Sequence, residues 1–273
     1  MRCARIWLAL LPLAACGPPP ADLGSADYAA LDLPIRCGPG EKPGGAGEDN
    51  TLSTAGGIRL GVRTPRNYDA ARAHPLLVVF APAGHGRLRS EQFAGLTRDA
   101  TAHGFIVAYA DHRTLSGATF DELGKIPALI VGRWCVDEQR IHFAGHSDGG
   151  TAAAAVAFLR TSALPPAALV ISAAGIRQQD LAQYACPPPV SVMLIHSRED
   201  RLFPPPAFGI GPARWWAACN HCGPQRQRSI EGCEEYSGCA DGRRMLYCET
   251  SDPHTRWPGL GSAMLDFLAA ARR

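Results

Sequence analysis

The chain has 273 residues, of which 46% are hydrophobic and 19% charged, and its formal net charge is +2. This composition excludes an intrinsically disordered chain, because it supplies enough apolar side chains to build a core. It also argues against nucleic acid as a partner, because no Lys/Arg-rich run provides the basic surface that phosphate binding requires. Single α/β domains commonly reach this length, so one folded domain is expected.

The N-terminus has the pattern of an export signal. Arg2 and Arg5 precede an apolar stretch, residues 6–15, that is too short to span a bilayer. The Leu-Ala-Ala-Cys run that ends at Cys16 resembles a bacterial lipoprotein signal, in which the cysteine becomes the lipidated first residue. We therefore expect residues 1–15 to be a signal peptide and Cys16 to anchor the exported protein to a membrane, on its periplasmic or cell-surface side. An ordinary cleaved signal, which would release a secreted protein, is the alternative.

Residues 16–50 differ in composition from the rest of the chain. They are rich in Pro, Gly and Ala and show no sustained apolar periodicity. Such a segment is typical of a linker or of irregular surface, and its proline run just after Cys16 favours a stiff, extended spacer. The folded domain is therefore expected to comprise residues 51–273.

The cysteines outside the signal region indicate disulfide bonds. There are eight of them, an even number in a chain with an export signal. Cys219 and Cys222 have the spacing of zinc ligands, so a structural metal site is the alternative, but no second close pair completes a zinc ribbon. We expect bridges and no metal, with the pairing left open. The eight residues are Cys37, Cys135, Cys186, Cys219, Cys222, Cys233, Cys239 and Cys248.

Short apolar runs alternate with segments of helical pattern along the domain. The runs are continuous rather than alternating, as expected for strands covered on both faces of a mostly parallel sheet. They are Leu76–Phe80, Phe105–Tyr109, Ile141–Ala144, Leu169–Ile171, Val190–Ile195 and Met245–Cys248.

Three segments between and after these runs predict helices. Ser90 is a candidate N-cap for a helix that ends at Gly104, residues 151–160 are rich in Ala, and residues 263–271 have one apolar face. Alternating strands and helices with right-handed crossovers predict an α/β fold with three layers, α/β/α.

The motif Gly145-His146-Ser147-Asp148-Gly149 lies between a predicted strand and the Ala-rich helix. This is the nucleophile-elbow pattern of α/β-hydrolases, in which the serine is held on a sharp turn at the carboxyl end of a strand. The glycines leave room for that turn. The alternative is a tight turn with a capping serine. In this context we expect Ser147 to be a catalytic nucleophile and the fold to be that of an α/β-hydrolase.

A serine nucleophile needs a histidine to accept its proton and an acid to orient the histidine. In this fold the acid and then the histidine follow the serine along the chain. Asp200 follows the predicted strand Val190–Ile195 and is the first candidate for the acid, with Glu199 second. A solvated loop carboxylate is the alternative for Asp200.

Only His221 and His254 follow Asp200 in the sequence. His221 lies between two cysteines that are expected to be bridged. His254 follows the last predicted strand and precedes the last helix, where a loop returns to the edge of the sheet. We therefore predict His254 as the base.

An oxyanion hole needs two backbone N–H donors, one after the nucleophile and one from the loop after an early strand. The first is the amide of Asp148. The second is expected from the loop 81–86, where Pro82 has no N–H, so Ala83 is the predicted donor. A plain glycine-rich turn is the alternative for this loop. His146 and Trp257 are expected to contact the substrate.

From about Ile58 to the C-terminus, these motifs together resemble the secreted poly(3-hydroxybutyrate) depolymerases and the feruloyl or acetylxylan esterases. The resemblance is carried by the run Pro-Leu-Leu-Val-Val-Phe from Pro75, the run Val-Asp-Glu-Gln-Arg-Ile before the elbow, and Gly-His-Ser-Asp-Gly-Gly around Ser147. Residues 196–204 are similar to a His-Gly-x-x-Asp-x-x-Val-Pro pattern that places Asp200 at the acid. His254 with the following Trp-Pro-Gly is similar to a Gly-His-x-Trp-Pro-Gly pattern.

Two departures from the resemblance concern the site. Ala81-Pro82 replace the usual His-Gly of the oxyanion loop, and Arg256 adds one residue between His254 and Trp-Pro-Gly. The resemblance implies a serine hydrolase of carboxylic esters that needs neither cofactor nor metal, with a small or a polymeric ester as substrate. The alternatives are a thioesterase or peptidase with the same triad, and a surface binding protein whose catalysis is lost.

Overall fold

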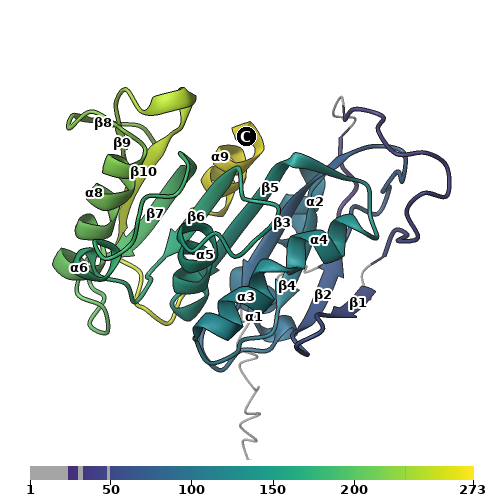
Figure 1. Cartoon of the computed structure of the whole chain (residues 1–273), viewed down its shortest axis with the longest axis horizontal. Coiled ribbons are helices and arrows are strands. Elements are labelled where there is room, and N and C mark those ends of the chain that lie inside the picture. The colour runs from purple at the N-terminus through teal and green to yellow at the C-terminus, as the bar shows by residue number, and fades with distance from the viewer. Residues whose placement is uncertain (1–23, 30–32, 48–49, 231) are drawn as a thin grey trace, which may run out of the picture.

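A computed structural model of the chain describes residues 24–29, 33–47, 50–230 and 232–273. The predicted signal peptide 1–15 and the predicted lipid site Cys16 lie outside these residues. In the described part, one sheet runs through the middle of the molecule with helices on either side (Figure 1). Among the described residues, no helix is long and apolar enough to cross a membrane.

The sheet contains ten strands in the order β1-β2-β4-β3-β5-β6-β7-β10-β9-β8. Neighbours from β4 to β10 in this order are parallel, whereas the pairs toward both edges are antiparallel. The prediction of a mostly parallel sheet is confirmed. The strands are β1 (Asn50–Ser53), β2 (Arg59–Arg63), β3 (His74–Phe80), β4 (Ile106–Ala110), β5 (Val136–His146), β6 (Ala168–Ser172), β7 (Ser191–Ser197), β8 (Arg226–Arg228), β9 (Cys233–Tyr236) and β10 (Met245–Thr250).

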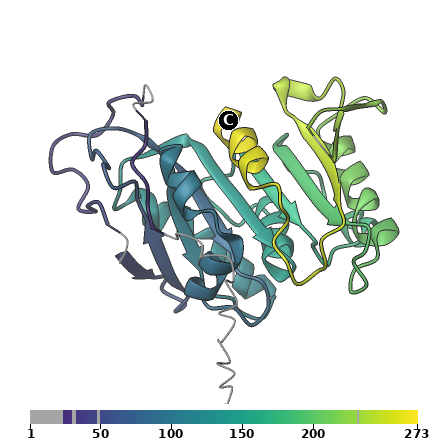
Figure 2. The ribbon, with the colours of Figure 1, turned by 180° about the vertical axis from the view of Figure 1, so that it is seen from behind.

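Helices cover both faces of the sheet. α3, α4, α5 and α8 lie on one face (Figure 1), and α1, α2 and α9 lie on the other (Figure 2). The helices are α1 (Arg87–Ala94), α2 (Thr97–Ala102), α3 (Gly117–Gly124), α4 (Ile126–Val131), α5 (Asp148–Phe158), α6 (Gln178–Leu181), α7 (Pro205–Phe208), α8 (Ile210–Cys219) and α9 (Gly261–Ala270), with a 3-10 turn at Ala240–Gly242.

The core is divided into two apolar clusters by the sheet. Along β3, Leu76, Val78 and Phe80 belong to the cluster under α5, whereas Leu77 and Val79 belong to the cluster under α9. Successive side chains of a strand point to opposite faces, so a strand between two helical layers must be apolar at every position. This confirms the three-layer α/β/α prediction from the continuous apolar runs.

The helix predicted from Ser90 to Gly104 is two helices instead. α1 begins after Gly86, so Ser90 is buried inside it rather than capping it. Gly95 ends α1 in the left-handed conformation, with φ of 63°, and its N–H bonds to the Glu91 carbonyl. Glycine adopts this conformation without steric cost, and it turns the chain before α2 begins.

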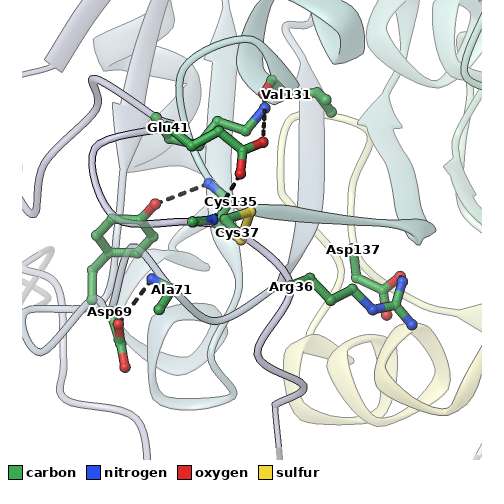
Figure 3. The surroundings of a disulfide bond; sticks show 11 residues. Arg36, Cys37, Glu41, Asp69, Ala71, Val131, Cys135 and Asp137 are labelled. Atoms are coloured by element: carbon green, nitrogen blue, oxygen red, sulfur yellow. Dashed lines mark hydrogen bonds and ion pairs between the residues drawn. A yellow bond between two sulfur atoms is a disulfide. The ribbon is translucent and has the colours of Figure 1, made fainter.

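The described segment 33–47 is irregular but is attached to the domain. A disulfide joins Cys37 to Cys135, just before β5, and the Arg36 guanidinium lies 3.2 Å from the buried Asp137 carboxylate (Figure 3). The bridge closes a loop between residues 98 apart in the sequence. On the chain-entropy account, a loop of that length contributes about 4.7 kcal/mol of stability.

The eight cysteines considered in the sequence form four disulfides, so the prediction of bridges is confirmed. Cys219 and Cys222 belong to two different bridges. The pairs are Cys37–Cys135, Cys186–Cys219, Cys222–Cys239 and Cys233–Cys248.

Candidate active site

Ser147 lies on the sharp turn between β5 and α5. Its φ and ψ are 56° and −123°, a conformation that residues other than glycine rarely adopt. The turn is held in part by the Ser147 N–H, which donates to the Ser172 carbonyl at the end of β6 (2.9 Å). The structure therefore places Ser147 at the carboxyl end of the central strands, in the strained geometry of a nucleophile elbow.

The glycines around Ser147 are needed for space. A Cβ atom on Gly145 would lie 2.1 Å from the Gly149 carbonyl oxygen, and one on Gly149 would lie 2.1 Å from the Phe80 carbonyl oxygen. Neither glycine has a positive φ, so close backbone packing and not conformational freedom explains them. The unusual conformation belongs to the serine itself.

Three residues far apart in the sequence meet at this end of the sheet. The His254 Nε2 atom lies 3.0 Å from the Ser147 Oγ, and its Nδ1 lies 2.7 Å from the Asp200 Oδ2. Asp200 follows β7, and His254 follows β10, the strand paired in parallel with β7. Parallel pairing brings the carboxyl ends of the strands to one edge, which is why these loops converge. Because the Nδ1–H of His254 donates to the Asp200 carboxylate, the ring is oriented to accept the serine proton at Nε2.

Asp200 is buried in its loop, whereas its neighbour Glu199 is exposed. The Oδ1 atom of Asp200 accepts the N–H groups of Leu202 and Phe203, each at 2.9 Å. Burial alone opposes ionisation, but the Phe203 N–H and His254 outweigh it and lower the pKa of Asp200. Asp200, and not Glu199, is thus the carboxylate that faces His254.

His146 is buried next to Ser147 and supports the His254 loop. Its Nε2 donates to the His254 carbonyl oxygen (2.7 Å), so its Nδ1 accepts from the Ser172 hydroxyl (2.9 Å). Burial lowers the pKa of His146 to about 4, which keeps this neutral arrangement at neutral pH. The ring borders the cleft, but both nitrogens are bonded to protein groups. The contact of His146 with the substrate stays a prediction, and its two hydrogen bonds give it a positioning role as well.

The two backbone N–H groups predicted for the oxyanion hole, those of Asp148 and Ala83, have no backbone acceptor among the described residues. Asp148 is the first residue of α5, so its N–H has no acceptor within the helix. The N–H of Ala83, in the loop after β3, has no backbone acceptor among the described residues. The two loops are linked by His112, whose Nδ1 accepts from the Gly84 N–H (3.5 Å) and whose Nε2 donates to the Asp148 carboxylate (3.0 Å). The sequence motifs did not single out His112.

A cleft of about 580 Å³ opens in front of Ser147 and His254. Phe93 of α1, Pro82 and Leu202 provide its apolar wall. Phe93 also packs edge-on against the rings of His146 and Trp257. Nothing in the local sequence pattern of Phe93 distinguishes a ring that lines a cleft from one that packs in the core.

Trp257 is a predicted substrate-contact residue, but the structure does not place it in the lining of the cleft. It is largely buried behind Phe93, within the cluster under α9, and it does not line the cleft. Trp216 is likewise a core residue, and Trp215 packs against it and Phe158. Within the described ranges, no group of three His, Cys, Asp or Glu side chains is arranged to hold a metal ion.

The sheet order, the strained serine turn and the three converging loops define the fold as that of an α/β-hydrolase. No protein-family model and no curated protein match the sequence. Solved structures do match it. An acetyl xylan esterase from Aspergillus awamori superimposes with a TM-score of 0.63 at 13% identity, over 81% of this chain and 99% of that one.

Two further esterases have the same fold. A thermostable esterase gives a TM-score of 0.59 at 16% identity, over 82% of this chain and 62% of that chain. A hyperthermophilic esterase from the archaeon Pyrobaculum calidifontis gives 0.54 at 18% identity, over 82% and 81%. At such low identity the likeness concerns the fold.

Proposed function

We propose that this protein is a serine hydrolase of carboxylic esters. The observation that carries the proposal is the hydrogen-bonded series Ser147–His254–Asp200 at the mouth of an open cleft, with the serine on a strained turn. Structural triads of this kind activate a hydroxyl that is otherwise a weak nucleophile. The three structural neighbours described above are named as esterases, which supports ester hydrolysis among the reactions open to such a triad.

In the first step, the Ser147 Oγ attacks the ester carbonyl carbon while His254 Nε2 takes its proton. The carbonyl oxygen becomes an oxyanion between the N–H groups of Ala83 and Asp148. Asp200 stabilises the imidazolium of His254 without accepting its proton. The tetrahedral intermediate then expels the alcohol, which receives the proton from His254 and leaves an acyl-serine.

In the second step, water attacks the acyl-serine. His254 removes a proton from the water, and the oxyanion forms again between the same two N–H groups. Ser147 then leaves with the proton from His254, and the carboxylic acid is released. Each step uses groups of this chain and one water, so the reaction balances as ester plus water giving acid plus alcohol.

The proposal is tested with a fluorophosphonate probe and with 4-nitrophenyl butyrate. Wild type is expected to be labelled on Ser147 and to hydrolyse the ester, whereas Ser147→Ala is expected to lose labelling and nearly all turnover at unchanged circular dichroism. Because triad members act as a unit, His254→Ala should lose about as much as Ser147→Ala. Labelling at another residue, or activity retained by Ser147→Ala, would contradict the proposal. Cleavage of a peptide amide alone would favour a peptidase.

For the substrate, we propose short-acyl or aryl esters, with 3-hydroxybutyrate oligomers ahead of feruloyl esters. The resemblance of the sequence motifs supports both groups, and the name of the Aspergillus awamori neighbour adds acetylated xylan. The cleft is open and has one apolar wall. Such a shape suits an extended chain, whereas a flat aromatic ring would require a closed slot. Hydroxybutyrate oligomers, methyl ferulate and acetylated xylan, compared at equal enzyme concentration, separate these substrates.

We also propose that the enzyme is exported and held to a membrane by lipid on Cys16. The basic start, the short apolar stretch and the cysteine that follows it support this, and the disulfides are consistent with an oxidising compartment. Mass spectrometry of the mature N-terminus is expected to show a diacylated or triacylated Cys16. A soluble protein that begins after Ala15 without lipid would contradict the anchor, although not the export.

A further inference from the structure

The described residues that line the cleft include basic side chains and no acidic ones. Arg89 of α1 and His85 line it beside Ser147 and His254, and no Asp or Glu among the described residues does so. Arg89 is exposed, and within the described part of the chain it forms no ion pair. A substrate in this cleft therefore meets a guanidinium whose charge no carboxylate of the cleft offsets.

A second cavity, of about 380 Å³, extends this positive region beyond the oxyanion loop. It shares His85 with the cleft and is also lined by Arg59, Arg113 and Asp111. The Asp111 carboxylate is already engaged, because it lies 2.7 Å from the Arg59 Nε and 3.6 Å from Arg87. Its negative charge is therefore balanced by those two arginines and does not neutralise the charge of Arg89.

The carboxylates next to the nucleophile are also engaged, and Asp200 accepts the hydrogen bond of His254 at 2.7 Å. Asp148 accepts the hydrogen bond of His112 at 3.0 Å. Arg113, at the far side of the second cavity, donates to the Gly57 carbonyl and forms no ion pair within the described residues. Together these contacts leave the region between the two cavities with an excess of positive charge.

The position of Arg89 in α1 adds to the effect. Arg87 and Arg89 occupy the first turn of the helix, and that turn has no acidic residue. The N-terminal end of a helix is the positive end of its dipole, where cations are unfavourable and anions are favourable. Burial lowers the pKa of His85, and Arg89 and His112 lower it further, so His85 is a neutral hydrogen-bond donor and acceptor beside the arginine.

We infer that the enzyme prefers esters that carry a carboxylate on the acyl or the alcohol part, and that Arg89 binds this carboxylate with His85 beside it. A guanidinium matches a carboxylate with two parallel hydrogen bonds, and Phe93 and Leu202 take the apolar part of the same substrate. The inference rests on the proposed ester hydrolysis and names its substrate class.

Two pairs of substrates test each side of the ester. For the acyl part, mono-4-nitrophenyl adipate is compared with 4-nitrophenyl hexanoate, which has the same chain length and no carboxylate. For the alcohol part, 3-acetoxybutyrate is compared with its neutral primary amide. We expect kcat/KM to favour the anionic member of at least one pair, and this preference to shrink when ionic strength rises from about 0.05 M to about 0.5 M.

Variants then assign the preference to Arg89. Arg89→Gln is expected to lower kcat/KM for the preferred anionic ester about fivefold, the upper range for an exposed ion pair, and to lower it much less for the neutral partner. Arg89→Lys should keep part of the preference. Arg133 is an exposed arginine that precedes β5, at the opposite end of the sheet. Arg133→Gln is the matched control and should change kcat/KM for neither ester.

Several results would overturn the inference. Equal or lower kcat/KM for the anionic member of both pairs would do so, as would equal effects of Arg89→Gln on both members. If these results occur while the neutral esters are cleaved through Ser147, only the anionic preference fails. If no ester is cleaved and the fluorophosphonate does not label Ser147, the proposed function itself fails, and this inference with it.

Discussion

Asp200 and Glu199 are adjacent in the sequence, but only Asp200 is buried and bonded to His254. The amide of an asparagine in its place presents a donor where His254 Nδ1 needs an acceptor, so the histidine takes the wrong tautomer. We therefore expect Asp200→Asn to lower kcat by about 10⁴-fold, as the equivalent change does in other triads. Steady-state kinetics on 4-nitrophenyl butyrate measure the effect.

Glu199→Gln is the matched control for this prediction. The Glu199 side chain is exposed and has no hydrogen bond or ion pair to the described residues, whereas its backbone N–H donates to the Ser197 hydroxyl. Its variant is expected to stay within about twofold of wild type, the range of surface changes away from a site. If Glu199→Gln were the damaging change, the acid would be assigned to the wrong residue.

At the scale of elements, the site depends on how closely α5 approaches β3. The Gly149 Cα lies so near the Phe80 carbonyl that an added methyl group meets backbone, which cannot rotate away as a side chain can. Gly149→Ala is expected to destabilise the protein by about 3 kcal/mol or more, the upper end for overpacking, and to remove activity by moving the oxyanion turn. Urea denaturation followed by circular dichroism measures the free energy of unfolding.

Gly117→Ala provides the comparison. Gly117 is the first residue of α3, its φ is not positive, and an added Cβ has no neighbour within 4 Å. Alanine is the better helix former, so the change should be neutral or slightly stabilising, within about 0.5 kcal/mol. Equal stability of the two variants would show that the approach of α5 to β3 is looser than the structure gives.

At the scale of the whole molecule, buried histidines connect stability to pH. The His142 side chain is fully buried in β5 near Phe105, and neither ring nitrogen has a partner among the described residues. Burial, with a smaller contribution from the charge of Arg140, lowers the pKa of His142 to about 3. The folded protein therefore binds fewer protons than the unfolded chain between about pH 6.5 and about pH 3.

The sign of the effect follows from this difference in proton binding. The stability contribution is complete above about pH 6.5 and decreases as the pH falls toward the folded pKa, so acidification from pH 7 to about pH 4.5 removes up to about 2.7 kcal/mol. His142→Leu has no proton to bind and should show a smaller loss between these two pH values. Urea denaturation at both pH values tests it, and an equal loss in variant and wild type would contradict it.

The sequence by itself determined the layered fold and the nucleophile turn. Continuous apolar runs reveal strands covered on both faces, because alternate side chains must all be apolar there. The glycines and the serine of the elbow are neighbours in the chain, so their geometry is local. The order of serine, acid and histidine along strands of known direction then placed Asp200 and His254 at one edge of the sheet.

Only the tertiary structure decided which side chains meet from distant segments. The pairing of the eight cysteines, the contact of His112 with Asp148 and the burial of Trp257 behind Phe93 all depend on how the strands are ordered and the helices seated. Periodicity and turn residues indicate what each segment requires locally, whereas a partner 98 residues away, as Cys37 is for Cys135, is selected by the packing of the whole domain. The positive charge of the cleft is likewise decided by the tertiary structure. Arg89 and Ser147 line one cleft only because the segments that follow β3 and β5 converge.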